Sequence, residues 1–232
     1  MDPVHAARAL VDRHYPEAVV AVLAGSSARG QLTPTSDLDV VLVLPGRACS
    51  FRRTLRHEGR LAEVFAYTPD ELRRWWDVDA ATSRCTLVHM CASGVLLRGE
   101  RDGGPAMQQQ ARVFLAAGPP PAGDDELAAR RYRLTASVDD LRDATDAGEW
   151  QVLAAEVLLE AAQLHLLVRR QWLGSGKWLL RRLRDADPDL AQRLVQAHRH
   201  AVCAVQVQPL VQVVEEVLRG GGGSLAEGYG AG

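Results

Sequence analysis

The sequence predicts an α/β domain with a mixed sheet over residues 1–117, followed by an all-α helical bundle domain over residues 124–219. Three observations lead to this prediction. Strand-like alternation and helical patterns mix before residue 118, whereas only helical periodicity follows residue 123. Between them lies Gly-Pro-Pro-Pro-Ala-Gly at 118–123, where three consecutive prolines fit neither a helix interior nor a central strand. We therefore expect a linker at 118–123.

The elements of the first domain follow from apolar spacing and turn residues. Thr68 and Pro69 are typical of an N-cap and first helical position, and His57-Glu58-Gly59-Arg60 is a plausible hairpin turn. The expected helices cover 6–14, the segment from 69 on, 86–92 and 107–117, and the expected strands cover 17–24, 37–44, 51–56, 60–67 and 94–97.

The second domain is expected to contain only helices. Helical periodicity covers 124–147, 150–172, 177–184 and 188–218, with a break at Gly174-Ser175-Gly176. The glycine-rich end, 220–232, is expected to be a flexible tail.

Composition narrows the classes of function. A net charge of −2 gives no general attraction to nucleic acid or to membranes. The N-terminus lacks the apolar segment of a signal peptide, and no apolar run approaches the length of a membrane span, so we expect a cytoplasmic protein. The four cysteines show no zinc-binding spacing and are expected to be reduced thiols.

The most informative segment joins two strands through a polar turn. It begins at Gly25-Ser26, where backbone N–H groups and a hydroxyl could approach a phosphate, and it ends at Ser36-Asp37-Leu38-Asp39. Because alternate strand residues share a face, Asp37 and Asp39 point the same way and repel each other unless a cation binds them. Mg²⁺ prefers such oxygen ligands. The segment therefore predicts a site for phosphoryl or nucleotidyl transfer.

Gly-Ser, a spacer of about ten residues and Asp-Leu-Asp in an apolar strand resemble the signature of the DNA polymerase β-like nucleotidyltransferase superfamily, whose small members include aminoglycoside adenylyltransferases. The resemblance covers residues 19–43 by motif and most of the chain more loosely. The family pattern requires a third carboxylate on a later strand, and Glu63 fits best, ahead of Glu58 and Asp70. The resemblance thus implies that Asp37, Asp39 and Glu63 bind metal, with two Mg²⁺ ions.

The resemblance also implies nucleotide contacts outside the acidic strand. Lys177 is the only lysine among 27 basic residues and opens a helix, a position that attracts phosphate. Family members place basic residues of the helical domain against the β- and γ-phosphates, so Lys177 and, as a weaker companion, Arg181 are expected there. Arg29 either contacts phosphate or closes the turn. The expected nucleotide-binding residues are Gly25, Ser26, Arg29, Ser36, Lys177 and Arg181.

The predicted activity is transfer of AMP from ATP to a hydroxyl of a small molecule, an aminoglycoside-like antibiotic being one example. The acids Asp139, Asp140, Glu156 and Glu160 could meet a cationic acceptor, although solvated helix faces explain them equally well. Two alternatives stay open: adenylylation of a protein partner, as in small antitoxin-type nucleotidyltransferases, and a non-catalytic nucleotide-binding module. Nucleic-acid polymerisation is least favoured, and a homodimer is compatible with the sequence.

Overall fold

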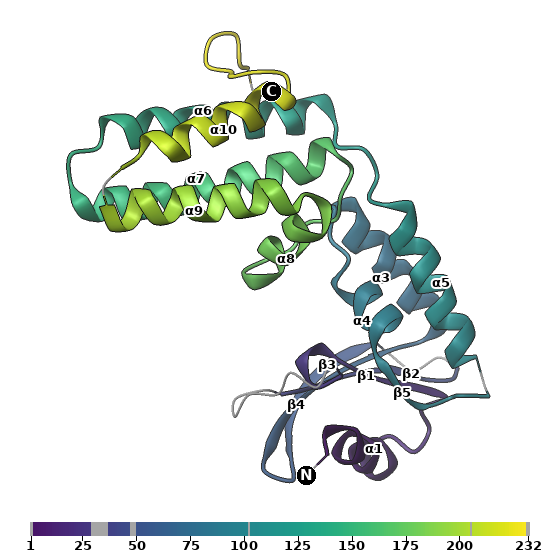
Figure 1. Ribbon diagram of the computed structural model, residues 1–232. Coiled ribbons are helices and arrows are strands. Elements are labelled where there is room, and N and C mark those ends of the chain that lie inside the picture. The colour runs from purple at the N-terminus through teal and green to yellow at the C-terminus, as the bar shows by residue number, and fades with distance from the viewer. Residues whose placement is uncertain (1, 29–36, 47–49, 102, 205, 231–232) are drawn as a thin grey trace. The chain divides into compact units, whose positions relative to one another are not determined.

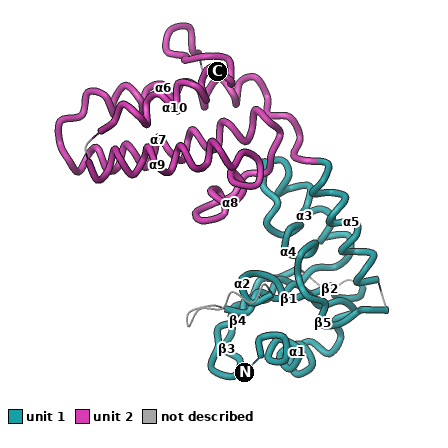
Figure 2. Tube along the Cα trace, viewed as in Figure 1, with its two compact units in different colours: residues 1–117 teal, residues 118–232 magenta. Residues whose placement is uncertain are grey.

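The computed structural model describes residues 2–28, 37–46, 50–101, 103–204 and 206–230. The chain divides into two compact units, residues 1–117 and residues 118–232 (Figure 2). We call them the first unit and the helical unit.

The first unit is built on a five-stranded sheet with the strand order β3-β4-β2-β1-β5. The strands are β1 Val20–Ala24, β2 Leu38–Val43, β3 Phe51–His57, β4 Arg60–Tyr67 and β5 Val95–Arg98. β2 and β4 run parallel, and the other three neighbouring pairs are antiparallel. The mixed sheet predicted from the sequence is therefore confirmed.

Helices cover both faces of this sheet (Figure 1). α1, Pro3–His14, buries Leu10 and Val11 against one face, where Leu38 and Val40 are also fully buried. α3 (Pro69–Ala81), α4 (Thr86–Ser93) and α5 (Gly104–Ala117) lie on the other side of the sheet. The short helix α2, Gly25–Ala28, directly follows β1. Because side chains alternate along each strand, one set packs under α1 and the other set lies on the opposite face of the sheet.

The helical unit contains five helices in its described part: α6 Asp124–Asp143, α7 Ala147–Val168, α8 Lys177–Ala186, α9 Pro188–Ala204 and α10 Gln208–Gly220. They enclose one apolar core that includes Leu134, Leu164 and Leu194. Three predicted helices of this unit had wrong bounds. α6 ends at 143 rather than 147, α7 covers 147–168 rather than 150–172, and the expected helix 188–218 is two helices.

The cause lies in local caps and breakers. The carboxylate of Asp146 accepts the backbone N–H groups of Gly148 and Glu149, at 2.8 and 3.0 Å, and so begins α7 earlier than the apolar periodicity suggested. Pro209 lies in the first turn of α10, where a missing N–H is tolerated, so the periodic apolar pattern resumes in a new helix.

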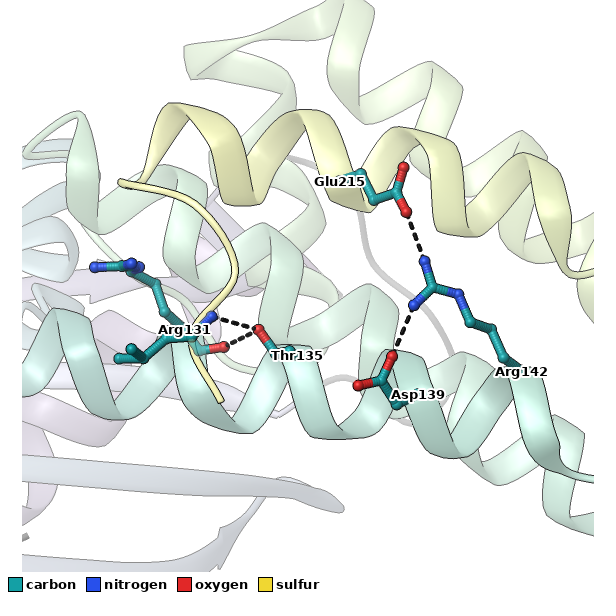
Figure 3. A network of polar contacts seen from close by, with 6 residues as sticks. Arg131, Thr135, Asp139, Arg142 and Glu215 are labelled. Atoms are coloured by element: carbon teal, nitrogen blue, oxygen red, sulfur yellow. Dashed lines mark hydrogen bonds and ion pairs between the residues drawn. The ribbon is translucent and has the colours of Figure 1, made fainter. Parts of the chain in front are cut away.

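Arg142 connects α6 to α10 (Figure 3). Its guanidinium donates to Asp139 of its own helix at 2.7 Å and to Glu215 of α10 at 2.5 Å. A forked guanidinium can hold two carboxylates at once. The contact therefore joins the first helix of the unit to the last.

The glycine-rich end, expected to be a flexible tail, contacts α6 as far as Tyr229, whose ring stacks on the ring of Tyr132 with centroids 4.4 Å apart. Arg131 donates to the carbonyls of Gly222 and Gly223, each at 2.7 Å. The hydroxyl of Thr135 accepts the backbone N–H of Leu225 at 3.1 Å (Figure 3). Side chains of α6 thus form hydrogen bonds with backbone groups of a segment that its glycine content predicted to be flexible.

α7 differs from expectation in another respect. By length and composition it is apolar enough to cross a membrane, although the sequence was not expected to contain such a run. Its buried residues, Val157, Leu164 and Leu167 among them, belong to the core of the helical unit. Core helices and membrane spans share this composition, so the match carries little weight.

The cysteines in the described part of the chain are free thiols. Cys85 and Cys91 are buried and Cys203 is exposed, whereas Cys49 lies outside the described residues. Burial raises the pKa of Cys91 to about 12, which makes it an inert core residue.

Candidate active site

Three carboxylates meet on the sheet face opposite α1. One carboxylate oxygen from each of Asp37, Asp39 and Glu63 lies within 4.8 Å of the other two, and each residue is half-buried. These are the three carboxylates that the sequence and the family resemblance selected. Their proximity is a finding, and their roles remain predictions.

Strand register explains the proximity. Asp39 on β2 is the direct neighbour of Glu63 on β4 in the parallel pair. Leu38 and Val64 are fully buried on the α1 face, so the residues that alternate with them face the other way. Asp37 precedes β2 and shares that face. The apolar core under α1 therefore orients the acids.

Gly25 lies against this cluster. Its φ of +70° is a conformation that L-residues rarely adopt, and a Cβ at this position would collide with the carboxylate of Asp39. The buried hydroxyl of Ser27 donates to the carbonyl of Asp37 at 2.7 Å and so ties α2 to the start of β2. Gly25 and Ser26 were predicted from the sequence, whereas Ser27 was missed. The only sequence signal for Ser27 is its position next to Gly25-Ser26.

Arg52 of β3 is a second residue that sequence reasoning missed. Its guanidinium donates to Glu63 Oε2 at 2.7 Å and lies over the ring of Phe65, 4.9 Å from the centroid. In the β3–β4 hairpin Arg52 is directly opposite Phe65, two residues from Glu63. The hairpin was predicted, so its cross-strand pairs could have pointed to Arg52.

Four further predicted residues are not part of the described cluster. Arg29 and Ser36 lie outside the described residues. Lys177 is exposed at the first position of α8 in the helical unit, and the guanidinium of Arg181 lies 4.8 Å from the centroid of the Trp178 ring. The geometry of the acidic cluster does not test these assignments, which stay predictions.

The donor set suits a hard divalent cation. Three carboxylates supply oxygen ligands of the kind that Mg²⁺ and Mn²⁺ prefer, and no sulfur or imidazole takes part in the group. Arg52 contributes one positive charge, at Glu63. The residues present therefore fit the Mg²⁺ expected from the sequence.

A family model matches the part of the chain that contains the acidic cluster. Residues 6–80 are similar to the nucleotidyltransferase domain, whose family model matches them. This stretch contains Gly25, Arg52 and all three carboxylates. A crystal structure of a nucleotidyltransferase-like protein from Exiguobacterium sibiricum 255-15 aligns with 94% of this chain and 77% of its own, at 15% identity and a TM-score of 0.47. No curated protein matched the sequence.

Proposed function

We propose that this protein transfers a nucleoside monophosphate, AMP from ATP, to a hydroxyl group of a small molecule and releases pyrophosphate. One observation carries the proposal: the carboxylates of Asp37, Asp39 and Glu63 converge within 4.8 Å beside Gly25, inside the stretch that matches the nucleotidyltransferase domain. A general phosphate-binding protein would not need three converging carboxylates, because they repel phosphate unless a cation is bound.

In this reaction the hydroxyl oxygen of the acceptor attacks the α-phosphorus of the triphosphate. A new oxygen–phosphorus bond forms, the bond from the α-phosphorus to the bridging oxygen breaks, and pyrophosphate leaves with the electron pair. The hydroxyl proton passes to a carboxylate of the cluster or to solvent. Atoms and charge then balance with ATP and the acceptor as the only reactants.

The chain's own residues position these groups. Gly25 leaves room for the Asp39 carboxylate against its backbone, and Ser26 offers a hydroxyl at the same turn. Arg52 neutralises part of the charge of Glu63 through its 2.7 Å hydrogen bond. Asp37, Asp39 and Glu63 would hold Mg²⁺, which when bound neutralises phosphate charge and polarises the α-phosphoryl group. Catalysis would rest mainly on positioning and charge neutralisation.

Transfer of label from α-³²P-ATP in the presence of Mg²⁺ tests the proposal. The acceptors are a set of small hydroxylated molecules, the protein itself and a cell lysate. We expect label on a small molecule, loss of transfer in Asp37→Ala/Asp39→Ala, and full transfer in Asp77→Asn, which removes an exposed acid of α3. Substantial transfer by the folded double variant would refute the proposal, and label on a protein would favour the protein-adenylylating alternative.

Lys177 and Arg181 are proposed to bind the β- and γ-phosphates. Support comes from the exposed position of Lys177 in the first turn of α8, where helix backbone N–H groups and an ammonium both favour anions. Lys177→Ala should raise the Michaelis constant for ATP several-fold, whereas Arg184→Ala, exposed on the same helix, should not. An unchanged constant in Lys177→Ala would remove Lys177 from the site.

An aminoglycoside-like acceptor has weaker support. Of the acids expected to meet a cationic ligand, Asp139 binds Arg142, and Glu160 accepts a hydrogen bond from Ser137 at 3.2 Å. Glu156 and Glu160 do line a cavity of about 680 Å³ in the helical unit. Burial raises the pKa of Glu160, which weakens it as a permanent anion at acidic pH.

A further inference from the structure

We propose that a pocket beside the acidic cluster binds the acceptor, and that this acceptor is a hydroxyl-bearing amine with a flat apolar ring. The proposal rests on the proposed nucleotidyl transfer and names the substrate class for it. The pocket lies in the first unit, between the sheet and the helices α3 and α4, and has a volume of about 380 Å³. That volume is within the range of small-molecule sites.

The order of the strands assigns this pocket to the acceptor. Gly25 follows β1, Asp39 lies on β2 and Glu63 lies on β4, which are consecutive in the sheet. The pocket continues beyond Glu63, with Phe65 on β4 and Arg52 on β3 in its wall. In an in-line displacement the attacking and leaving oxygens lie on opposite sides of the phosphorus. With the leaving phosphates at Gly25, the hydroxyl must therefore arrive from the β4 side.

The wall of the pocket selects a flat apolar ring. Phe65, Tyr67 and Trp75 contribute aromatic rings, and Met90 contributes a thioether that adapts to ring edges. Phe65 and Tyr67 follow Glu63 at two-residue spacing, so all three share one face of β4. Trp75 is 44% exposed, which is unusual for so large an apolar group and leaves its ring available to a ligand.

Asp79 selects an amine. Its half-buried carboxylate accepts the backbone N–H of Leu87 at 3.2 Å, which fixes one oxygen and leaves the other able to bind a cation. Burial and the charge of Asp79 raise the pKa of Tyr67, so its phenol is neutral at physiological pH and adds no second negative charge. A carboxylate among aromatic rings is a favourable environment for an ammonium group.

The two charges give the acceptor a direction. Arg52 occupies the end of the pocket next to Glu63, where its guanidinium repels a cation and can donate to a hydroxyl oxygen. Asp79 attracts the amine to the α3 end. The hydroxyl then points toward the acidic cluster and the ring lies between the two charges.

Binding of a matched pair of probes tests the pocket. 4-(Aminomethyl)benzyl alcohol carries a hydroxyl and an amine on opposite sides of one ring, and 1,4-benzenedimethanol is the diol in which a hydroxyl replaces the amine. Titrations followed by NMR use the wild-type protein and Asp37→Ala/Asp39→Ala, which separates binding from turnover. We expect the amine to bind about tenfold more tightly than the diol in both proteins, because a charge-assisted hydrogen bond is lost in the diol.

Three variants locate the binding. Asp79→Asn should abolish the advantage of the amine, Asp77→Asn on the same helix should keep it, and Trp75→Ala should weaken both probes. If Asp79→Asn fails to fold, Trp75→Ala still tests the pocket, because Trp75 is partly exposed and its removal leaves the fold intact. Absence of binding to the wild type, or an unchanged preference in Asp79→Asn, would overturn the proposal.

The outcomes also separate this proposal from the proposed function. Binding of the amine to the pocket without any label transfer would reject nucleotidyl transfer and leave the pocket a binding site for amines. Conversely, label transfer could occur with the same Michaelis constant for the acceptor in the wild type, Asp79→Asn and Trp75→Ala. That result would uphold nucleotidyl transfer and reject the pocket as the acceptor site.

Discussion

Replacing Gly25 with alanine separates backbone strain from damage to the acidic cluster. Gly25 has a φ of +70°, and a Cβ there would collide with the carboxylate of Asp39. An L-residue in this region costs about 1–2 kcal/mol of folding free energy. For a chain of this size that corresponds to a melting temperature lower by roughly 2–8 °C. The collision additionally forces the Asp39 carboxylate away from its partners.

Gly59→Ala is the matched control. Gly59 has a φ of +80°, with nothing within 4 Å of an added Cβ, so it pays the same conformational cost without a collision. Calorimetry should show a loss of stability in Gly59→Ala and a loss at least as large in Gly25→Ala. Titration with Mn²⁺, followed by electron paramagnetic resonance, should show binding at least tenfold weaker in Gly25→Ala and unchanged in Gly59→Ala. Equal Mn²⁺ affinity in the two variants would refute the link between Gly25 and the cluster.

Three further outcomes are expected. Arg52→Ala removes the positive charge at Glu63 and should tighten Mn²⁺ binding several-fold, and weaker Mn²⁺ binding would contradict this. The free energy of unfolding should change by about 1 kcal/mol or less, because the ion pair is partly exposed. Cys91, with its pKa raised to about 12 by burial, should resist iodoacetamide at pH 8 in the folded protein while exposed Cys203 reacts, as mass spectrometry can show. Burial lowers the pKa of His165 below 6.5, so its stabilising contribution is complete above pH 6.5 and is lost as the pH falls through the folded-state pKa. Urea unfolding should therefore depend more steeply on pH between 7 and 5 in the wild type than in His165→Gln.

The acidic cluster could be predicted because its geometry depends on alternation. Once apolar Leu38 and Val40 are assigned to the core, Asp37 and Asp39 must share the opposite face. The position of Glu63 could not be predicted from alternation alone, because alternation does not show that β4 pairs with β2. The family resemblance supplied that step, and the parallel register then placed Glu63 beside Asp39.

Other features depend on tertiary contacts that periodicity does not encode. Arg52 reaches Glu63 from a neighbouring strand, so its role follows from hairpin register rather than from its own segment. The start of α7 depends on the side chain of Asp146, and the order at the glycine-rich end depends on Arg131. In each case the local structure depends on one side chain whose hydrogen bond goes to another strand, to a helix end or to the end of the chain.

The turn at Glu58-Gly59 carries a consequence for the evolution of this chain. It joins β3 to β4 and sets which residues of β4 stand beside β2. Deleting one residue between this turn and Glu63 would move the Glu63 carboxylate to the α1 side and turn Val64 toward Asp39. Selection should therefore purge single-residue insertions and deletions here even where they leave every acidic residue intact, so that segment length is inherited as strictly as residue identity.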